Sequence, residues 1–187
     1  MPADRPPLTR CPPLGRAVGV PPGETMLEPR LTSTAIDALE FRLLGPFEVR
    51  RGDEVVAVGG RRQRMVLAIL ALRPGALLSQ DRLIEEIWGE SAPSSAVRTL
   101  HAYISRLRAV LRSGTPHPAD ALVRRGPGYL LDVRPDQVDV ERFENLVAEA
   151  TTALSEGRPE RAAIVLRRAL SLWRGPAMGE FADERCV

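Results

Sequence analysis

The chain has 187 residues, of which 44% are hydrophobic and 27% charged, so it can form one medium domain or two small ones of ordinary globular composition. Its longest apolar run spans residues 65–72, far below the roughly 18 apolar residues of a membrane-spanning helix, and no signal segment opens it. Cys11 and Cys186 lack any disulfide or metal-ligand spacing, so a membrane protein, a secreted mini-protein and a zinc finger are excluded.

The charges are unevenly distributed, although the net charge is only +2. All 26 basic residues are arginines. Residues 95–135 contain seven arginines and two acids, whereas residues 136–187 contain seven arginines and ten acids. A basic segment between near-neutral and acidic segments forms a local electrostatic footprint of the kind found in nucleic-acid-binding proteins.

Residues 1–38 are predicted to form a disordered tail. Eight of the 17 prolines lie within residues 1–30, which show neither helix nor strand periodicity. Because proline fixes φ and removes a backbone donor, such a stretch forms neither a helix nor a strand ladder. Met26 is kept as an alternative start of the chain.

Two strands and a helix are expected next. Residues 41–50 predict a strand interrupted at Gly45-Pro46, and residues 54–58 predict a second strand after a turn. Gly59-Gly60 ends that strand and precedes a helix over residues 61–72. The apolar residues expected to face the core are Phe41, Leu43, Phe47, Val49, Met65, Leu67, Ala68, Ile69 and Leu72.

Two further helices follow a short strand at residues 76–78. Ser79 is a good N-cap for the first of them, which runs to Trp88 and ends at Gly89. Ser94 or Ser95 is expected to cap the next helix, which reaches about residue 112. Their predicted core residues are Leu83, Ile84, Ile87 and Trp88, then Val97, Leu100, Ile104, Leu107 and Leu111.

A tight hairpin and a helical pair complete the chain. After a polar linker, residues 122–131 predict a hairpin that turns at Gly126-Pro127-Gly128. Residues 140–154 and 159–173 then predict antiparallel helices of the kind found in solenoid repeats, which are usually stable only when about three stack. The residues expected to join these helices are Phe143, Val147, Ala150 and Leu154, facing Ala162, Leu166, Ala169, Leu170 and Trp173.

The helix at residues 95–112 and the hairpin contain the side chains that are suited to DNA binding. In a helix-turn-helix the second helix enters the major groove, with phosphate donors at its edges and short or hydrogen-bonding groups toward the bases. Arg98, Thr99 and Arg108 suit the phosphate role. The base-facing role suits His101, Ala102, Ser105 and Arg106. The hairpin adds Arg124 and Arg125, in the form of a wing that lowers an arginine into the minor groove.

Residues 97–108 and 123–129 closely resemble the winged-helix effector domain of OmpR/PhoB-type response regulators. Residues 59–64, 139–143 and 170–175 narrow the resemblance to the Streptomyces antibiotic regulatory protein family, of AfsR/DnrI/RedD type. The resemblance covers residues 39 to about 182. It implies an α+β winged helix-turn-helix domain at 39–134, with N-terminal strands, three helices and a C-terminal hairpin wing. An all-α, TPR-like segment of the bacterial transcriptional activation domain follows at 135–187 and is expected to be truncated.

The same resemblance implies a function and partners. The protein is expected to activate a secondary-metabolite (antibiotic) gene cluster by binding direct repeats in double-stranded DNA near promoters. Implied partners are the RNA polymerase holoenzyme and a second copy bound head to tail on DNA, in the cytoplasm, and no cofactor is expected. The sequence departs from true response regulators in that no receiver domain is expected. The matching phosphate contacts are Arg98, Thr99 and Arg108, the matching base contacts His101, Ala102 and Arg106, and the matching wing residue Arg125. We add Arg112 to the phosphate set because it shares the basic face.

Other interpretations stay open beside this one. The acidic helical pair can be a protein-interaction module, or the chain can occupy DNA without activating transcription and so compete with full-length relatives. Neither a metal site at His101 and His117 nor an enzyme active site is expected. Trp88 and Trp173 are predicted to lie in the core, and Tyr103 either in the core or on a phosphate.

Overall fold

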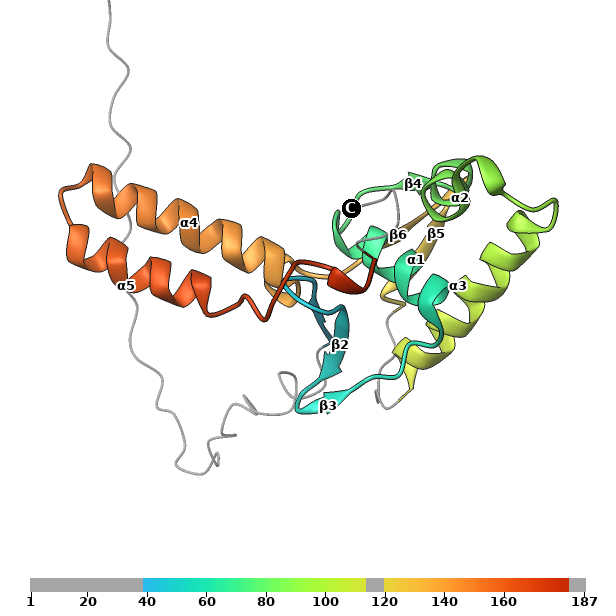
Figure 1. The fold of residues 1–187 in the computed structure, drawn as a ribbon, viewed down its shortest axis with the longest axis horizontal. Coiled ribbons are helices and arrows are strands. Elements are labelled where there is room, and N and C mark those ends of the chain that lie inside the picture. The colour runs from blue at the N-terminus through green and yellow to red at the C-terminus, as the bar shows by residue number, and fades with distance from the viewer. Residues whose placement is uncertain (1–38, 114–119, 182–187) are drawn as a thin grey trace, which may run out of the picture. The chain divides into compact units, whose positions relative to one another are not determined.

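The protein's structure is a computed structural model that describes residues 39–113 and 120–181. Within these residues it contains five α-helices, two three-stranded antiparallel sheets and three short 3-10 helices (Figure 1). The first sheet has the order β1-β2-β3. Its strands are β1 (Leu39–Arg42), β2 (Glu48–Arg51) and β3 (Glu54–Val55).

The predicted apolar face of the first sheet is confirmed. Phe41 pairs with Val49, and both are buried together with Leu43 and Phe47. Gly45, in the predicted interruption, has a φ of 148°, and a Cβ there would lie 2.9 Å from the Cβ of Arg174, so this position requires glycine. β3 is shorter than predicted. Glu54 and Val55 pair with β2, the Val56 backbone N–H still donates to the Val49 carbonyl at 2.8 Å, and Val58 is buried in the core.

The three helices of the next segment follow the predicted order. They are α1 (Arg61–Ala71), α2 (Gln80–Trp88) and α3 (Ala96–Arg112), with η1 (Gly89–Ser91) between the last two. The Ser79 hydroxyl accepts a hydrogen bond from the Arg82 backbone N–H at 3.1 Å, which confirms the predicted cap.

Two predicted core positions in these helices are wrong. Leu72 is 39% exposed because α1 ends one residue before it. Val97 is 43% exposed because Ala96 takes the inward position in the first turn of α3, in line with Leu100 and Ile104.

The predicted wing is confirmed as β5 (Leu122–Arg125) and β6 (Gly128–Leu131). Arg125 pairs with Gly128, so the hairpin turns through Gly126 and Pro127 alone. The two-residue strand β4 (Leu78–Ser79) pairs with β6 and completes a sheet of order β4-β6-β5. A side chain at Gly128 would collide with the Leu78 carbonyl oxygen, so this approach of β4 requires glycine.

The helical pair consists of α4 (Asp139–Ser155) and α5 (Pro159–Leu170), which run side by side in opposite directions (Figure 1). Small residues form its interior: Ala150, Ala153, Ala162, Val165 and Ala169. Four of the larger residues predicted to join the helices are instead 36–63% exposed: Leu154, Leu166, Leu170 and Trp173. Alanine contacts let the helix backbones approach closely, which displaces these side chains to one flank.

The core of the winged domain extends past residue 135, where the helical segment was expected to begin. Its buried cluster includes Val138, Met178 and Phe181. The Met178 backbone N–H donates to the Leu43 carbonyl at 2.9 Å, so the chain after α5 returns to the end of β1. No helix in the described ranges combines the length and the apolar character needed to cross a membrane.

Candidate nucleic-acid interface

One side of α3 is buried and the other is open. Leu100, Ile104 and Leu107 pack into the core. The opposite side exposes a polar and basic strip, here called the α3 strip: Arg98, His101, Ala102, Ser105, Arg106 and Arg112. The structure therefore brings all four predicted base-facing residues onto one accessible surface of one helix.

Four arginines of this region are exposed and keep their positive charge uncompensated. Arg98 and Arg106 lie on α3, and Arg124 and Arg125 lie at the tip of the wing. Among the residues that the structure describes, no acidic side chain pairs with any of the four. An unpaired guanidinium on an exposed surface can donate to a phosphate or to a base edge without first breaking an ion pair.

Arg112 differs from these four because it is already paired. Its guanidinium donates two hydrogen bonds to the carboxylate of Asp120. The hydrogen bond from Arg112 lowers the pKa of Asp120 below its ordinary value of 3.8, and the same bond raises the pKa of Arg112. The pair is exposed, so a DNA phosphate that binds Arg112 has to compete with this carboxylate.

Arg108 points toward the wing. Its Nε donates to the Leu122 carbonyl at 2.8 Å, and its guanidinium carbon lies 6.0 Å from the centre of the Tyr129 ring. The sequence predicted a phosphate contact for this residue. The structure places this half-buried residue at the contact between α3 and the hairpin, and its phosphate contact stays a prediction.

His101 also takes part in this contact. Its Nε2 lies 2.7 Å from Oε1 of Gln80, and its ring meets the Tyr129 ring edge-on at 6.5 Å. Sequence reasoning missed Gln80 and Tyr129. Gln80 follows the Ser79 cap directly, and this was the only local feature that drew attention to it. Its contact with His101 could not be predicted, because the two residues lie 21 positions apart in the chain.

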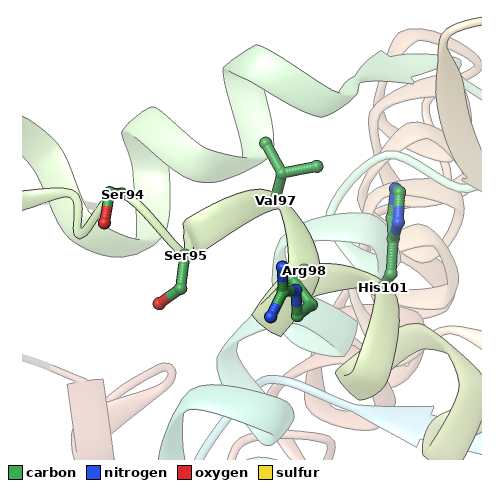
Figure 2. Close-up of a pocket in the computed structure, with 5 residues that line it drawn as sticks. All are labelled: Ser94, Ser95, Val97, Arg98 and His101. Carbon is green, nitrogen blue, oxygen red and sulfur yellow. The ribbon is translucent and has the colours of Figure 1, made fainter.

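A hollow opens beside the first turn of α3 and is lined by Ser94, Ser95, Val97, Arg98 and His101 (Figure 2). Free backbone N–H groups at a helix N-terminus attract anions. Together with Arg98 they give this end of the α3 strip a positive potential. The exposed Val97 and the hydroxyls of Ser94 and Ser95 are additional lining groups that the sequence did not assign to the interface.

Trp88 and Trp173 differ in their burial. Trp88 is 9% exposed and stacks on Tyr103 at a ring distance of 6.3 Å, so Tyr103 packs against the core. Trp173 is 43% exposed and meets Phe143 edge-on at 5.7 Å, so its predicted burial is wrong. Within residues 39–113 and 120–181 no group of three metal-ligating side chains occurs, and His117 lies outside them.

Comparisons with known proteins match both parts of the chain. Residues 54–131 match the family "Transcriptional regulatory protein, C terminal", and residues 138–187 match the "Bacterial transcriptional activator domain". The regulatory protein AfsR of Streptomyces griseus is 35% identical over 175 residues, covering 91% of this chain and 17% of AfsR. The regulatory protein DnrI of Streptomyces peucetius is 36% identical, covering 75% of this chain and 53% of DnrI.

A solved structure shares the fold. It is Mycobacterium tuberculosis EmbR in complex with a low affinity phosphopeptide, with a TM-score of 0.75 and 34% identity. The match covers 79% of this chain and 39% of the EmbR chain. The chain therefore spans about half or less of the length of these relatives.

Proposed function

Since the chain belongs to the Streptomyces antibiotic regulatory protein family, by an OmpR/PhoB-type DNA-binding domain followed by a bacterial transcriptional activator domain, we propose that it is a sequence-specific transcriptional activator. Its target is an antibiotic or other secondary-metabolite gene cluster. One observation carries the proposal: the α3 strip and the wing together expose four arginines that pair with no acidic side chain of residues 39–113 and 120–181.

The α3 strip is proposed to read the major groove. Arg106 is exposed and can donate two parallel hydrogen bonds to O6 and N7 of guanine. His101, Ala102 and Ser105 lie on the same surface and offer smaller contacts to neighbouring bases. Arg98 and the half-buried Thr99, near the start of the helix, would hold phosphates and set the register.

The wing is proposed to enter the adjacent minor groove. Arg124 and Arg125 are exposed directly before the two-residue turn at Gly126 and Pro127. An arginine gains most from a narrow minor groove, where the negative potential is concentrated, and A/T-rich steps narrow that groove. The wing would therefore add a preference for A/T-rich flanks.

The operator is proposed to be a direct repeat with its halves about one helical turn apart. Two copies would then bind head to tail. This arrangement agrees with the resemblance to regulators that bind direct repeats, and it places both α3 strips on the same side of the duplex.

The proposal is tested by selecting bound duplexes from a random pool with the full chain, then measuring affinity against salt on the selected sequence. We expect a recurring direct repeat and a logarithm of affinity that falls steeply with the logarithm of salt concentration. Arg106→Ala should reduce the binding free energy by about 1–3 kcal/mol and remove the base preference at one position of the operator. Arg125→Ala should weaken binding most on operators with A/T-rich flanks.

Arg167→Ala is the matched control, because Arg167 is exposed on α5 and carries the same charge. It should leave both affinity and base preference unchanged. Failure to enrich any sequence, or an equal effect of the three substitutions, would contradict the proposed interface.

A second function, protein interaction, is favoured by the exposed flank of the helical pair. We define this apolar flank by its four members, Leu154, Leu166, Leu170 and Trp173. Exposed apolar groups gathered on one side of a helical pair mark a contact surface for another protein. RNA polymerase holoenzyme is the proposed partner, because an activator has to recruit it.

A reporter assay separates activation from simple occupancy of the operator. Leu170→Ser should leave operator affinity unchanged but lower promoter activation. Ile164→Ser is the control, because Ile164 is also 63% exposed but lies about 120° away around α5. If the unmodified chain binds the operator and gives no activation, it acts as a competitor of longer relatives.

A further inference from the structure

A network of polar and ring contacts joins the wing to α3. Arg108 of α3 donates from Nε to the Leu122 carbonyl at the start of the wing. The same guanidinium lies over the ring of Tyr129, which is 3% exposed. One side chain of α3 therefore touches both strands of the hairpin.

A second link runs through Gln80, the first residue of α2. Its side-chain Oε1 lies 2.7 Å from Nε2 of His101, and its backbone N–H donates to the Pro127 carbonyl at 3.1 Å. Pro127 is one of the two turn residues of the wing. Gln80 thus connects the α3 strip to the end of the hairpin that carries Arg124 and Arg125.

The wing needs such links to hold a fixed position. Each of its strands has four residues, and β4 adds only two pairs, Leu78 with Tyr129 and Ser79 with Gly128. A two-stranded hairpin is marginally stable by itself. Leu122, Tyr129 and Leu131 anchor the base of the hairpin in the core, and the polar contacts at Leu122, Pro127 and Tyr129 further restrain the end that carries its arginines.

We propose that Arg108 is a positioning residue of the DNA-binding surface and that Gln80 and His101 support it, so that α3 and the wing bind DNA as one rigid surface. The inference rests on the proposed function, and it gives Arg108 a different role from the phosphate contact that the sequence predicted. A fixed wing has already lost its conformational entropy before binding, which strengthens binding without any new contact to DNA.

A double-mutant cycle on the selected operator distinguishes positioning from direct contact. Arg108→Met keeps an unbranched apolar stem and removes the donor, and Arg125→Ala removes the wing contact. If Arg108 acts by placing the wing, Arg108→Met should weaken binding about tenfold or more in the wild-type chain but much less in the Arg125→Ala background. Independent, multiplicative losses would overturn the proposal.

A measurement without DNA tests the same contact and separates it from the proposed function. In the free protein, amide hydrogen exchange of β5 and β6 should be about tenfold faster or more in Arg108→Met, with exchange in α1 unchanged. Gln80→Ala should also make amide exchange of β5 and β6 faster. Arg106→Met, on the same helix, is the control and should leave the hairpin unchanged.

The two arms have separate outcomes. Unchanged exchange in Arg108→Met overturns the positioning role, whatever the DNA experiments give. Faster exchange in a protein that selects no DNA sequence would keep the contact and refute the proposed function. Arg108→Lys covers the case in which the methionine variant fails to fold, since lysine keeps the charge and loses the Nε donor; it should also loosen the hairpin.

Discussion

Asp139 is an acidic residue with a structural role at the start of α4. It is 2% exposed, and its carboxylate accepts hydrogen bonds from the backbone N–H groups of Leu43 and Leu44 at 2.7 and 2.9 Å. Its position in the first helical turn also suits the positive end of the helix dipole. This one side chain connects the end of β1 to a helix almost a hundred residues away.

Replacing Asp139 with asparagine should lower the free energy of unfolding by about 2–4 kcal/mol. One of the two backbone N–H groups would lose its acceptor, and the charge that strengthens both bonds would be lost. Urea unfolding measures the effect. Asp136→Asn is the control, since Asp136 is exposed and its carboxylate accepts hydrogen bonds from Arg134. An equal loss of stability there would refute the role of burial at Asp139.

Glu40 makes the folding stability of the protein depend on pH in the acidic range. Burial alone would raise its pKa, but hydrogen bonds from Arg42 and Arg142 hold that pKa below the ordinary value of 4.5. Because the folded carboxylate binds protons less readily than the unfolded one, its contribution to stability is complete above pH 4.5. It is lost as the pH falls through the folded pKa.

Glu40→Gln should therefore be less stable than the wild type at pH 7, and the difference should shrink as the pH falls below 4.5. Urea unfolding of both proteins between pH 7 and about pH 3 gives the comparison. A difference that stays constant over this range would show that the two arginines do not favour the charged form.

At the scale of the element, the helical pair shows how side-chain size sets helix spacing. The 3.6-residue period correctly identified both helices and three interior alanines, Ala150, Ala162 and Ala169. It could not tell which side of the apolar sector would face the partner helix. Close packing of the alanines placed Val165 inside and left Leu170 exposed, a choice that depends on the distance between the two helices.

Ala162→Leu should destabilise the helical pair by about 1–3 kcal/mol, because a larger side chain at this 1% exposed position forces the helices apart. Helix propensity hardly changes between the two residues, so the effect reports packing. Ala163→Leu, one position along and exposed, is the control. Thermal unfolding measures the stability of both variants. Equal losses of stability in the two would contradict this packing.

At the scale of the whole molecule, the chain after α5 completes the core of the winged domain. Phe181 is 0% exposed and lies 6.5 Å from the ring of Phe47. Beside it, the carboxylate of Glu180 accepts from Arg64 at 2.7 Å and from the Phe47 backbone N–H at 3.2 Å. The segment after α5 and the winged-helix domain thus share buried surface.

Phe181→Ala should lower the free energy of unfolding by about 3–5 kcal/mol, as expected when a buried phenylalanine leaves a cavity. The single unfolding transition should shift as a whole, when followed by both the circular dichroism of the helices and tryptophan fluorescence. A change confined to the helical pair would show that residue 181 does not belong to the common core. Ala163→Leu serves again as the surface control.

Local rules in the sequence determined the elements of this protein and their order. The Ser79 cap, the period of α3 and the glycine-rich turn of the wing each act within a few residues, so periodicity and turn chemistry sufficed to place them. The same rules predicted which side of α3 is open to a ligand.

Tertiary structure decided the contacts that join distant segments. Arg108 turns to the Leu122 carbonyl, Gln80 meets His101, and Phe181 enters the first domain's core. No periodic pattern encodes such pairs, because their partners lie 14 or more residues apart and are selected by the packed fold. The sequence pattern alone could not show that Arg108 reaches a carbonyl, because that contact depends on where the hairpin packs against α3.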